Sequence, residues 1–155
     1  VVIDPLRDEI YFAEKGKGSF LNDRRIRVSK RNTLNSCVFS IHRNVSINNN
    51  LSNTKFNKII KDLILEPSLI TREFGSSALS FAWLAAGKID CFLSNSLKLN
   101  EIACGELLIK EAGGYISNFK SKKAYNTPEE EIIAANPIIH RDFLKKIQTI
   151  NKKMF

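Results

Sequence analysis

Hydrophobic and polar positions change their spacing along the chain, and this change divides it into two parts. Residues 1–29 carry short apolar runs separated by turn residues, and residues 9–14 alternate between polar and apolar as antiparallel strands do. From residue 67 onward, strand-like runs alternate with stretches of helical spacing. We therefore expect a mixed α/β chain: a β-meander over 1–29 that completes an upstream antiparallel sheet, then an α/β part over 30–155 with a mostly parallel sheet covered by helices.

The same spacing places the individual elements of the second part. Gly113 and Gly114 follow a helical stretch, which is typical of a helix end. Asn136 followed by Pro137 is typical of a helix start. Strands are expected at 37–41, 69–71, 89–93, 115–117 and 132–135, helices at 56–64, 77–86, 101–112 and from 137 onward, and loops at 48–50 and 120–127.

Two glycines in the first part, Gly16 and Gly18, are compatible with a phosphate-binding loop or with a hairpin turn. The rest of a phosphate-loop motif is absent around them. A turn between the strand that ends near Glu14 and the strand that contains Phe20 explains both glycines. We therefore expect a hairpin here.

Composition narrows the class of protein. The 155 residues are 43% hydrophobic and 26% charged, which fits one soluble globular domain. No apolar run approaches the roughly 20 residues that span a bilayer, and no basic stretch followed by an apolar block marks a signal peptide. We expect a cytoplasmic protein without membrane contact. Because the chain begins inside a predicted strand and lacks an initial Met, we also expect that it belongs to a longer protein whose amino-terminal half is absent here.

Net charge and cysteine content narrow the class of protein only slightly further. The formal net charge is +8, but the basic residues are dispersed, with modest clusters at 24–27 and 152–153. No nucleic-acid recognition motif accompanies them, so a solvated surface is favoured over a nucleic-acid patch. Cys37, Cys91 and Cys104 are an odd number and lie far apart in apolar surroundings. They favour buried thiols in a reducing compartment over disulfides or a metal site.

Candidate chemistry lies where strands end and helices begin, because ligands of open α/β sheets gather there. Gly75, Ser76 and Ser77 precede a buried helix, and their N–H groups and hydroxyls could bind an anionic or hydroxylated ligand or simply cap the helix. At a second junction, Asn100 could cap the next helix, with Glu101 in its first turn. That carboxylate could hold Mg²⁺, or it could be an ordinary first-turn acid that the helix dipole stabilises.

The two histidines carry little information from spacing alone. His42 ends a predicted strand, where it could face a cleft. His140 lies on the last predicted helix, where we expect it at the surface. No arrangement of Ser, His and Asp typical of nucleophilic catalysis is recognisable.

Four segments match one known family in order and in spacing. Residues 72–90 read REFGSSALSFAWLAAGKID, and residues 14–22, 109–114 and 133–137 read EKGKGSFLN, IKEAGG and IAANP. Together they resemble the carboxy-terminal half of the inositol monophosphatase family, which includes bacterial extragenic-suppressor-type proteins. The longest segment is similar to the family's Arg-x-x-Gly-Ser-Ala-Ala-Leu…Ala-Ala-Gly-x-x-Asp stretch. Each match is weak alone, whereas four in register over almost the whole chain are specific.

The resemblance implies a layered α-β-α-β-α sandwich and Mg²⁺-dependent hydrolysis of phosphate monoesters such as inositol phosphates. It implies that Gly75, Ser76 and Ser77 line the pocket for the sugar hydroxyls, and that Glu101 is the one metal ligand in this half. The family's other ligands, a Glu and an Asp-Pro-Ile/Leu-Asp-Gly-Thr motif, precede the part resembled here, so no catalytic residue is expected in this chain. Asp4 belongs to a later Asn/Asp-Pro turn of the family and is not expected to bind metal.

Two positions depart from the family pattern at the expected site. The family has a Trp-Asp pair where this chain has Asn100 and Glu101, and Glu101 reaches one methylene further, which changes the geometry offered to Mg²⁺. A substrate-contacting Glu is common in the family where Ser94 stands. Two interpretations stay open: a phosphatase for an inositol, sugar or polyol phosphate or a bisphosphate, or a non-catalytic relative that binds RNA or the transcription machinery. The family also implies a homodimer.

Overall fold

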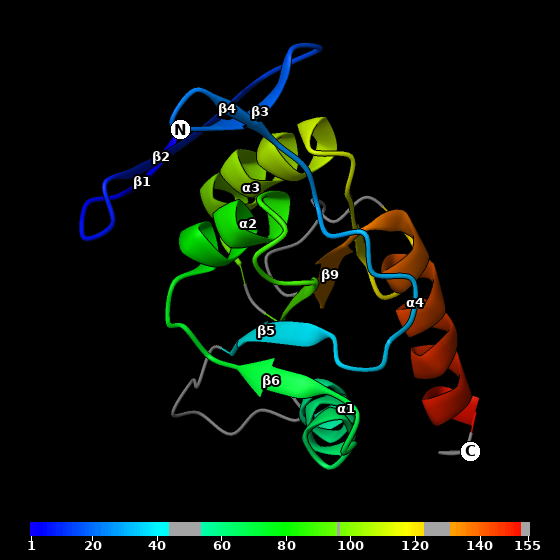
Figure 1. Ribbon diagram of the computed structural model, residues 1–155. Helices are drawn as coiled ribbons and strands as arrows, with labels where there is room; N and C mark the ends of the chain where they lie inside the picture. Colours follow the sequence, from blue (N-terminus) through cyan, green and yellow to red (C-terminus); the bar gives the residue numbers. More distant parts are fainter. Residues whose placement is uncertain (44–53, 96, 123–130, 153–155) are drawn as a thin grey trace.

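A four-stranded antiparallel meander, sheet A, forms one outer layer of the molecule (Figure 1). The protein is seen in a computed structural model that describes residues 1–43, 54–95, 97–122 and 131–152. The loop expected at 48–50 lies outside these residues, and so do residues 123–127 of the loop expected at 120–127. The strands of sheet A follow one another in chain order: β1 (Val2–Asp4), β2 (Glu9–Glu14), β3 (Gly18–Leu21) and β4 (Arg24–Ile26).

The turn between β2 and β3 contains both glycines of the first part. Their φ angles are 79° at Gly16 and 106° at Gly18, a region that is open to glycine and costly for other residues. The flanking strands pair antiparallel, with Glu14 opposite Gly18. The hairpin prediction is therefore confirmed.

Sheet B has five strands and is mixed rather than mostly parallel. Strand β5 runs parallel to its neighbours β6 and β7, as expected. Strand β9, however, runs antiparallel to both β7 and β8 and lies between them. Strands β7 and β8 are themselves parallel, as a helical connection predicts, but β9 inserts between them. The strands are β5 (Val38–His42), β6 (Ile70–Arg72), β7 (Cys91–Ser94), β8 (Tyr115–Asn118) and β9 (Ile132–Ala135), in the spatial order β6-β5-β7-β9-β8.

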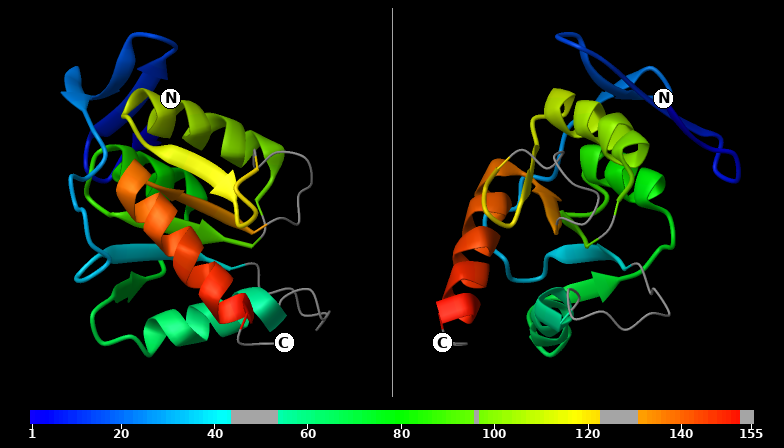
Figure 2. Two further views of the ribbon diagram at one scale, coloured as in Figure 1. Left: turned by 90° about the vertical axis from the view of Figure 1, so that its right-hand side faces the viewer. Right: turned by 180° about the vertical axis from the view of Figure 1, so that it is seen from behind.

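In the described part of the chain, four helices separate and cover the two sheets. Helices α2 and α3 lie between sheet A and sheet B, and α1 and α4 lie on the other face of sheet B (Figures 1 and 2). Helix α2 is apolar on nearly every side because it is covered by a sheet on each face, and its Phe81 and Leu84 are fully buried. The helices are α1 (Thr54–Ile64), α2 (Ser77–Ala85), α3 (Leu99–Glu111) and α4 (Pro137–Lys152).

The core follows this layering. One cluster of buried side chains joins sheet B to α1 and α4, and includes Phe39 and Phe143, whose ring centroids lie 5.3 Å apart. A second cluster joins sheet B to α2 and α3, and includes Phe81 and Phe92 at 4.6 Å. A third joins α2 and α3 to sheet A through Tyr11 and its neighbours. The layered α/β fold implied by the resemblance is confirmed for the described residues.

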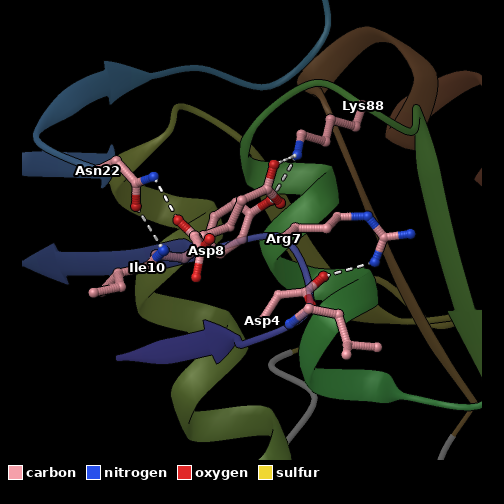
Figure 3. A network of polar contacts seen from close by, with 9 residues as sticks. Asp4, Arg7, Asp8, Ile10, Asn22 and Lys88 are labelled. Atoms are coloured by element: carbon pink, nitrogen blue, oxygen red, sulfur yellow. Dashed lines mark hydrogen bonds and ion pairs between the residues drawn. The ribbon is translucent and has the colours of Figure 1, made fainter.

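Polar side chains fasten sheet A to the helices beneath it. Lys88, in the turn after α2, donates to Glu9 at 2.5 Å and to the Tyr11 hydroxyl at 2.9 Å (Figure 3). At the end of α3, the Glu111 carboxylate accepts the backbone N–H groups of Gly16 at 2.8 Å and of Gly18 at 2.9 Å. The family-like segments 14–22 and 109–114 are thus in direct contact, and this contact holds sheet A against α3.

Turns within sheet A are closed by side chains of its own. The Asn22 side chain accepts the Ile10 N–H at 2.8 Å and donates to the Asp8 carbonyl at 2.7 Å (Figure 3). Asp4 is 2% exposed, accepts the Leu6 N–H and pairs with Arg7 at 2.8 Å. The contacts of Asp4 are those of a turn.

Candidate functional site

The two predicted strand–helix junctions meet in space. Ser77, the first residue of α2, donates a hydrogen bond from its hydroxyl to Oε1 of Glu101, in the first turn of α3. His42 and Ser94, the last residues of β5 and β7, stand opposite each other at the same end of sheet B. The sequence placed Ser77 and Glu101 at separate junctions, and the fold brings them into contact.

Glu101 is partly buried and its charge is held by hydrogen bonds. Burial works to raise the pKa of Glu101, but the Ser77 hydroxyl, the Lys98 backbone N–H and electrostatic interactions with His42 and Lys98 outweigh it and lower the pKa. The Lys98 N–H lies 2.9 Å from Oε2. Glu101 is therefore a carboxylate at neutral pH, with each oxygen accepting one hydrogen bond from the chain.

Gly75 and Ser76 form the approach to α2. Gly75 is exposed and has a φ of 73°, and beyond Gly75 and its two chain neighbours no heavy atom of the described residues lies within 4 Å of the place that a Cβ would occupy. Ser76 has an extended backbone, and its hydroxyl oxygen accepts the Leu79 N–H at 3.3 Å. Ser76 is thus the N-cap of α2, so the capping interpretation holds for it, while the space at Gly75 stays open to a ligand.

The start of α3 corrects one expectation. The helix begins at Leu99, two residues earlier than the pattern indicated, so the residue that precedes it is Lys98 and not Asn100. Asn100 lies exposed in the first turn and does not cap the helix. Instead, the Glu101 carboxylate accepts a hydrogen bond from the Lys98 N–H at the start of the helix. This contact stands in place of a side-chain cap from Asn or Ser.

Sequence reasoning missed Asn95 and two buried serines of sheet B and α2, and it considered Ser94 only as a departure from the family pattern. Asn95 follows β7 directly and is only 7% exposed, and Ser94, the last residue of β7, is fully buried. On β5, Ser40 shares a hydrogen bond of 2.9 Å with Ser80 of α2, and the Ser80 hydroxyl donates to the Ser76 carbonyl at 2.8 Å. A polar residue directly after an apolar strand was the available signal for Asn95.

His140 corrects a second expectation, since it is buried and not at the surface. It is 8% exposed, and its Nε2 lies 2.9 Å from the Ser117 hydroxyl on β8. Its position one turn after Asn136, which caps α4 through the Ile138 and Ile139 N–H groups, directs it toward sheet B. His140 therefore belongs to the packing of α4 and is remote in sequence from both junctions.

Two of the cysteines behave as predicted for buried thiols. Cys37 and Cys91 are fully buried, and Cys104 is half-buried. Burial raises the pKa of the Cys37 thiol to about 11 and that of Cys91 well above its usual value. All three cysteines are free.

The described side chains offer few ligands for a magnesium ion. Within residues 1–43, 54–95, 97–122 and 131–152, no three His, Cys, Asp or Glu side chains gather closely enough to hold a metal. Glu101 supplies one carboxylate, and both of its oxygens already accept hydrogen bonds. Mg²⁺ requires near-octahedral coordination by oxygen atoms. The described residues do not by themselves fit a magnesium site.

No helix in the described part of the chain is both long and apolar enough to cross a membrane.

Comparisons with known proteins agree with this architecture. The family model for the inositol monophosphatase family matches residues 1–152. The putative Nus factor SuhB of Neisseria meningitidis serogroup B is 35% identical over 147 residues, and the inositol-1-monophosphatase of Mesorhizobium japonicum is 34% identical over 151 residues. These matches cover 95% and 96% of this chain but 55% and 54% of the relatives. The chain thus spans about half the length of the curated relatives it matches.

A solved structure gives the same result. The extragenic suppressor protein suhB from Bartonella henselae superposes with a TM-score of 0.80 at 31% identity, covering 92% of this chain and 53% of that one. Fold, motif order and family model therefore agree: the chain belongs to the inositol monophosphatase family.

Proposed function

We propose that this chain is the carboxy-terminal part of a Mg²⁺-dependent phosphatase that hydrolyses inositol monophosphate or a related sugar or polyol phosphate. In this proposal Gly75, Ser76 and Ser77 line the pocket for the substrate hydroxyls, and Glu101 contributes one metal ligand. The remaining ligands and the catalytic groups come from the part of the protein that precedes these residues in the family.

The observation that carries the proposal is the contact between Ser77 and Glu101. It joins a hydroxyl and a carboxylate at the adjoining N-termini of two helices, where both helix dipoles present their positive ends. A phosphate group is attracted to such a place, and the charged state of Glu101 is maintained there by hydrogen bonds. The relative named as an inositol-1-monophosphatase supports the substrate class.

Substitution of Glu101 tests the proposal in the intact protein. Glu101→Ala should lower both the apparent affinity for Mg²⁺ and the turnover of inositol 1-phosphate by about tenfold or more, because loss of a group that shapes a metal site typically costs at least that much. Phosphate release is measured while Mg²⁺ is titrated.

Glu106→Ala is the matched control. Glu106 lies on the same helix and pairs with Lys110 at its surface, away from Ser77. It should leave the magnesium dependence unchanged. If Glu101→Ala responds to Mg²⁺ as the unmodified protein does, Glu101 is not part of the site.

A second function, of a different class, is favoured by the relatives that carry the name Nus factor SuhB. Such a protein would act as a non-catalytic scaffold that binds RNA or the transcription machinery, and the net charge of +8 suits RNA. Binding to RNA should then weaken steeply as salt is added. Absent or salt-insensitive binding, together with magnesium-dependent phosphate release, favours the enzyme. Under either function we propose a homodimer in the cytoplasm, without membrane contact.

A further inference from the structure

A groove of about 1020 Å³ lies between the free edge of sheet B and helix α4. One wall is the stretch from Gly113 to Ser117, which contains the start of β8, and the other is a stripe of α4 from Pro137 to Gln148. Figure 2 shows β8, in yellow, beside the orange and red helix α4. Among the described strands β8 pairs with β9 alone, so its other edge borders the groove.

Main-chain groups of β8 point into this groove. The Phe119 N–H donates to the Glu131 carbonyl at 3.1 Å, which extends the β8–β9 ladder by one pair. Because alternate residues direct their N–H and C=O groups to opposite edges, Ser117 bonds toward β9 and Ile116 directs its N–H and C=O outward. The Ile116 side chain packs in the cluster beneath α2 and α3, so the groove meets its main chain.

The groove is basic. Its described lining contains four cations and no Asp or Glu: Lys110, Lys122, Arg141 and Lys145. Lys110 pairs with Glu106, and Arg141 pairs with Asp142 at 2.9 Å. None of the ion pairs between described residues involves Lys122 or Lys145. A second copy of this chain would bring the same positive charges to the edge, so an acidic partner fits better.

The shape of the groove suits an extended chain. The α4 stripe rises by about 16 Å along the helix axis, which matches the length of about five residues in a strand. Tyr115 is 59% exposed and offers an aromatic surface at one end, and the hydrogen bond between His140 and Ser117 closes the floor. Backbone groups, an apolar surface and positive charge therefore line one narrow space.

We propose that this groove binds an extended acidic segment of a partner protein, which adds to sheet B as a strand beside β8. Strand addition supplies affinity through main-chain hydrogen bonds, here to Ile116, and the side-chain surroundings supply specificity. The groove lies at the carboxyl end of α3, about 18 Å along that helix from the end where Glu101 lies. The groove and Glu101 thus lie at opposite ends of α3, and binding in the groove does not depend on the proposed activity.

The test uses a labelled hexapeptide of alternating Glu and Val, acetylated and amidated at its ends, and the intact protein. Fluorescence anisotropy should detect binding, and Lys122→Glu with Lys145→Glu should weaken it at least tenfold. Lys61→Glu, on the exposed side of α1, is the matched control and should have no effect. Circular dichroism and urea unfolding are measured on each variant to show that the protein is folded, a control that holds whether or not the protein is a phosphatase.

A second pair of probes separates strand addition from simple charge attraction. The same hexapeptide with N-methyl groups on alternate amides keeps its charge but cannot complete the ladder, so it should not bind. Hydrogen exchange of the Ile116 amide should slow when the unmethylated peptide binds. Four outcomes would each overturn the proposal. Two of them are equal binding of the methylated peptide and an equal loss of peptide binding with Lys61→Glu. The other two are displacement of the labelled peptide by oligouridylate at a lower concentration than by unlabelled peptide, and no binding at millimolar peptide.

Discussion

The residues around His140 determine where its ring carries a proton and in which direction its pKa shifts. The Ser117 hydroxyl donates to the Asn118 carbonyl at 2.8 Å, so toward His140 it acts as the acceptor. The proton of the neutral imidazole therefore lies on Nε2. Burial lowers the pKa of His140 below its usual value, because the charged ring loses its water.

This burial predicts a pH dependence of stability. The pKa of His140 in the folded protein is below the value of 6.5 for an unperturbed histidine, so the unfolded chain binds the proton more readily. The contribution of the neutral ring is present above pH 6.5 and is lost as the pH falls below it. In His140→Gln, the free energy of unfolding, measured with urea between about pH 5 and pH 7.5, should fall less steeply with decreasing pH.

The comparison depends on the slope and not on the absolute stability, which the substitution also changes. Parallel curves for the two proteins would contradict the assignment of His140 as a buried neutral ring.

At the same scale, the candidate site was only partly predictable. Residue type and position placed Ser77 and Glu101 at helix starts, because capping and dipole effects are local in sequence. Their contact depends on how α2 packs against α3, which no local pattern encodes. The burial of His140 was missed for the same reason, since one polar residue on a helix does not reveal which neighbours cover it.

At the scale of elements, the close approach of α2 and α3 depends on one glycine. A Cβ built on Gly105 would lie 2.2 Å from Cδ2 of Phe81, far inside contact distance. Gly105 is buried in α3, and Phe81 is fully buried in α2. The missing side chain therefore makes room for the aromatic ring that fills the layer between the sheets.

Gly105→Ala should destabilise the protein although alanine is the better helix former. In an exposed helix this change would stabilise by up to about 1 kcal/mol, whereas overpacking here should cost about 1–3 kcal/mol. Urea unfolding of the intact protein measures the change. Ala103→Ser, at an exposed position of the same helix, should alter the stability by less than about 0.5 kcal/mol. A more stable Gly105→Ala protein would show that Phe81 can move aside.

The order of the elements was largely predictable, and the arrangement of sheet B was not. Period-two and helical spacing are properties of short windows, so β9 was found with its observed bounds and the other elements to within a few residues. The insertion of β9 between β7 and β8 is a pairing between distant segments. Both its faces are buried, and its apolar residues are equally compatible with parallel and antiparallel neighbours.

At the scale of the whole molecule, sheet A is attached to the layer beneath it by few polar contacts. Glu111 makes two of them, and their partners are 95 and 93 residues away in the chain. The Arg27 side chain adds a bond to the Glu111 carbonyl at 3.1 Å, and the Ser19 hydroxyl adds one to the Leu108 carbonyl at 2.6 Å. The end of α3 is thus one place where the meander is fixed to the rest of the fold, and Lys88, in the turn after α2, is another.

Removal of the Glu111 carboxylate should loosen this attachment. Glu111→Ala leaves the Gly16 and Gly18 amides without their acceptor, and hydrogen bonds to charged groups contribute about 1.5–3 kcal/mol, with the lower end applying to the exposed bond at Gly16. We expect a lower free energy of unfolding and faster hydrogen exchange at both glycines. Glu106→Ala, whose carboxylate meets only Lys110 among the described contacts, is the control. Unchanged exchange at Gly16 and Gly18 would contradict the role given to Glu111.

The same contact has a consequence for biosynthesis. Ribosomes release the chain from its amino end, so the β2–β3 hairpin emerges well before the carboxylate that binds its turn. Until then the turn lacks its acceptor and the strands lack the α3 side of the layer that they pack on, and a two-stranded ribbon alone is barely stable in water. The meander should therefore acquire its native order late in translation, and a chaperone that shields emerging apolar strands would act on it during that delay.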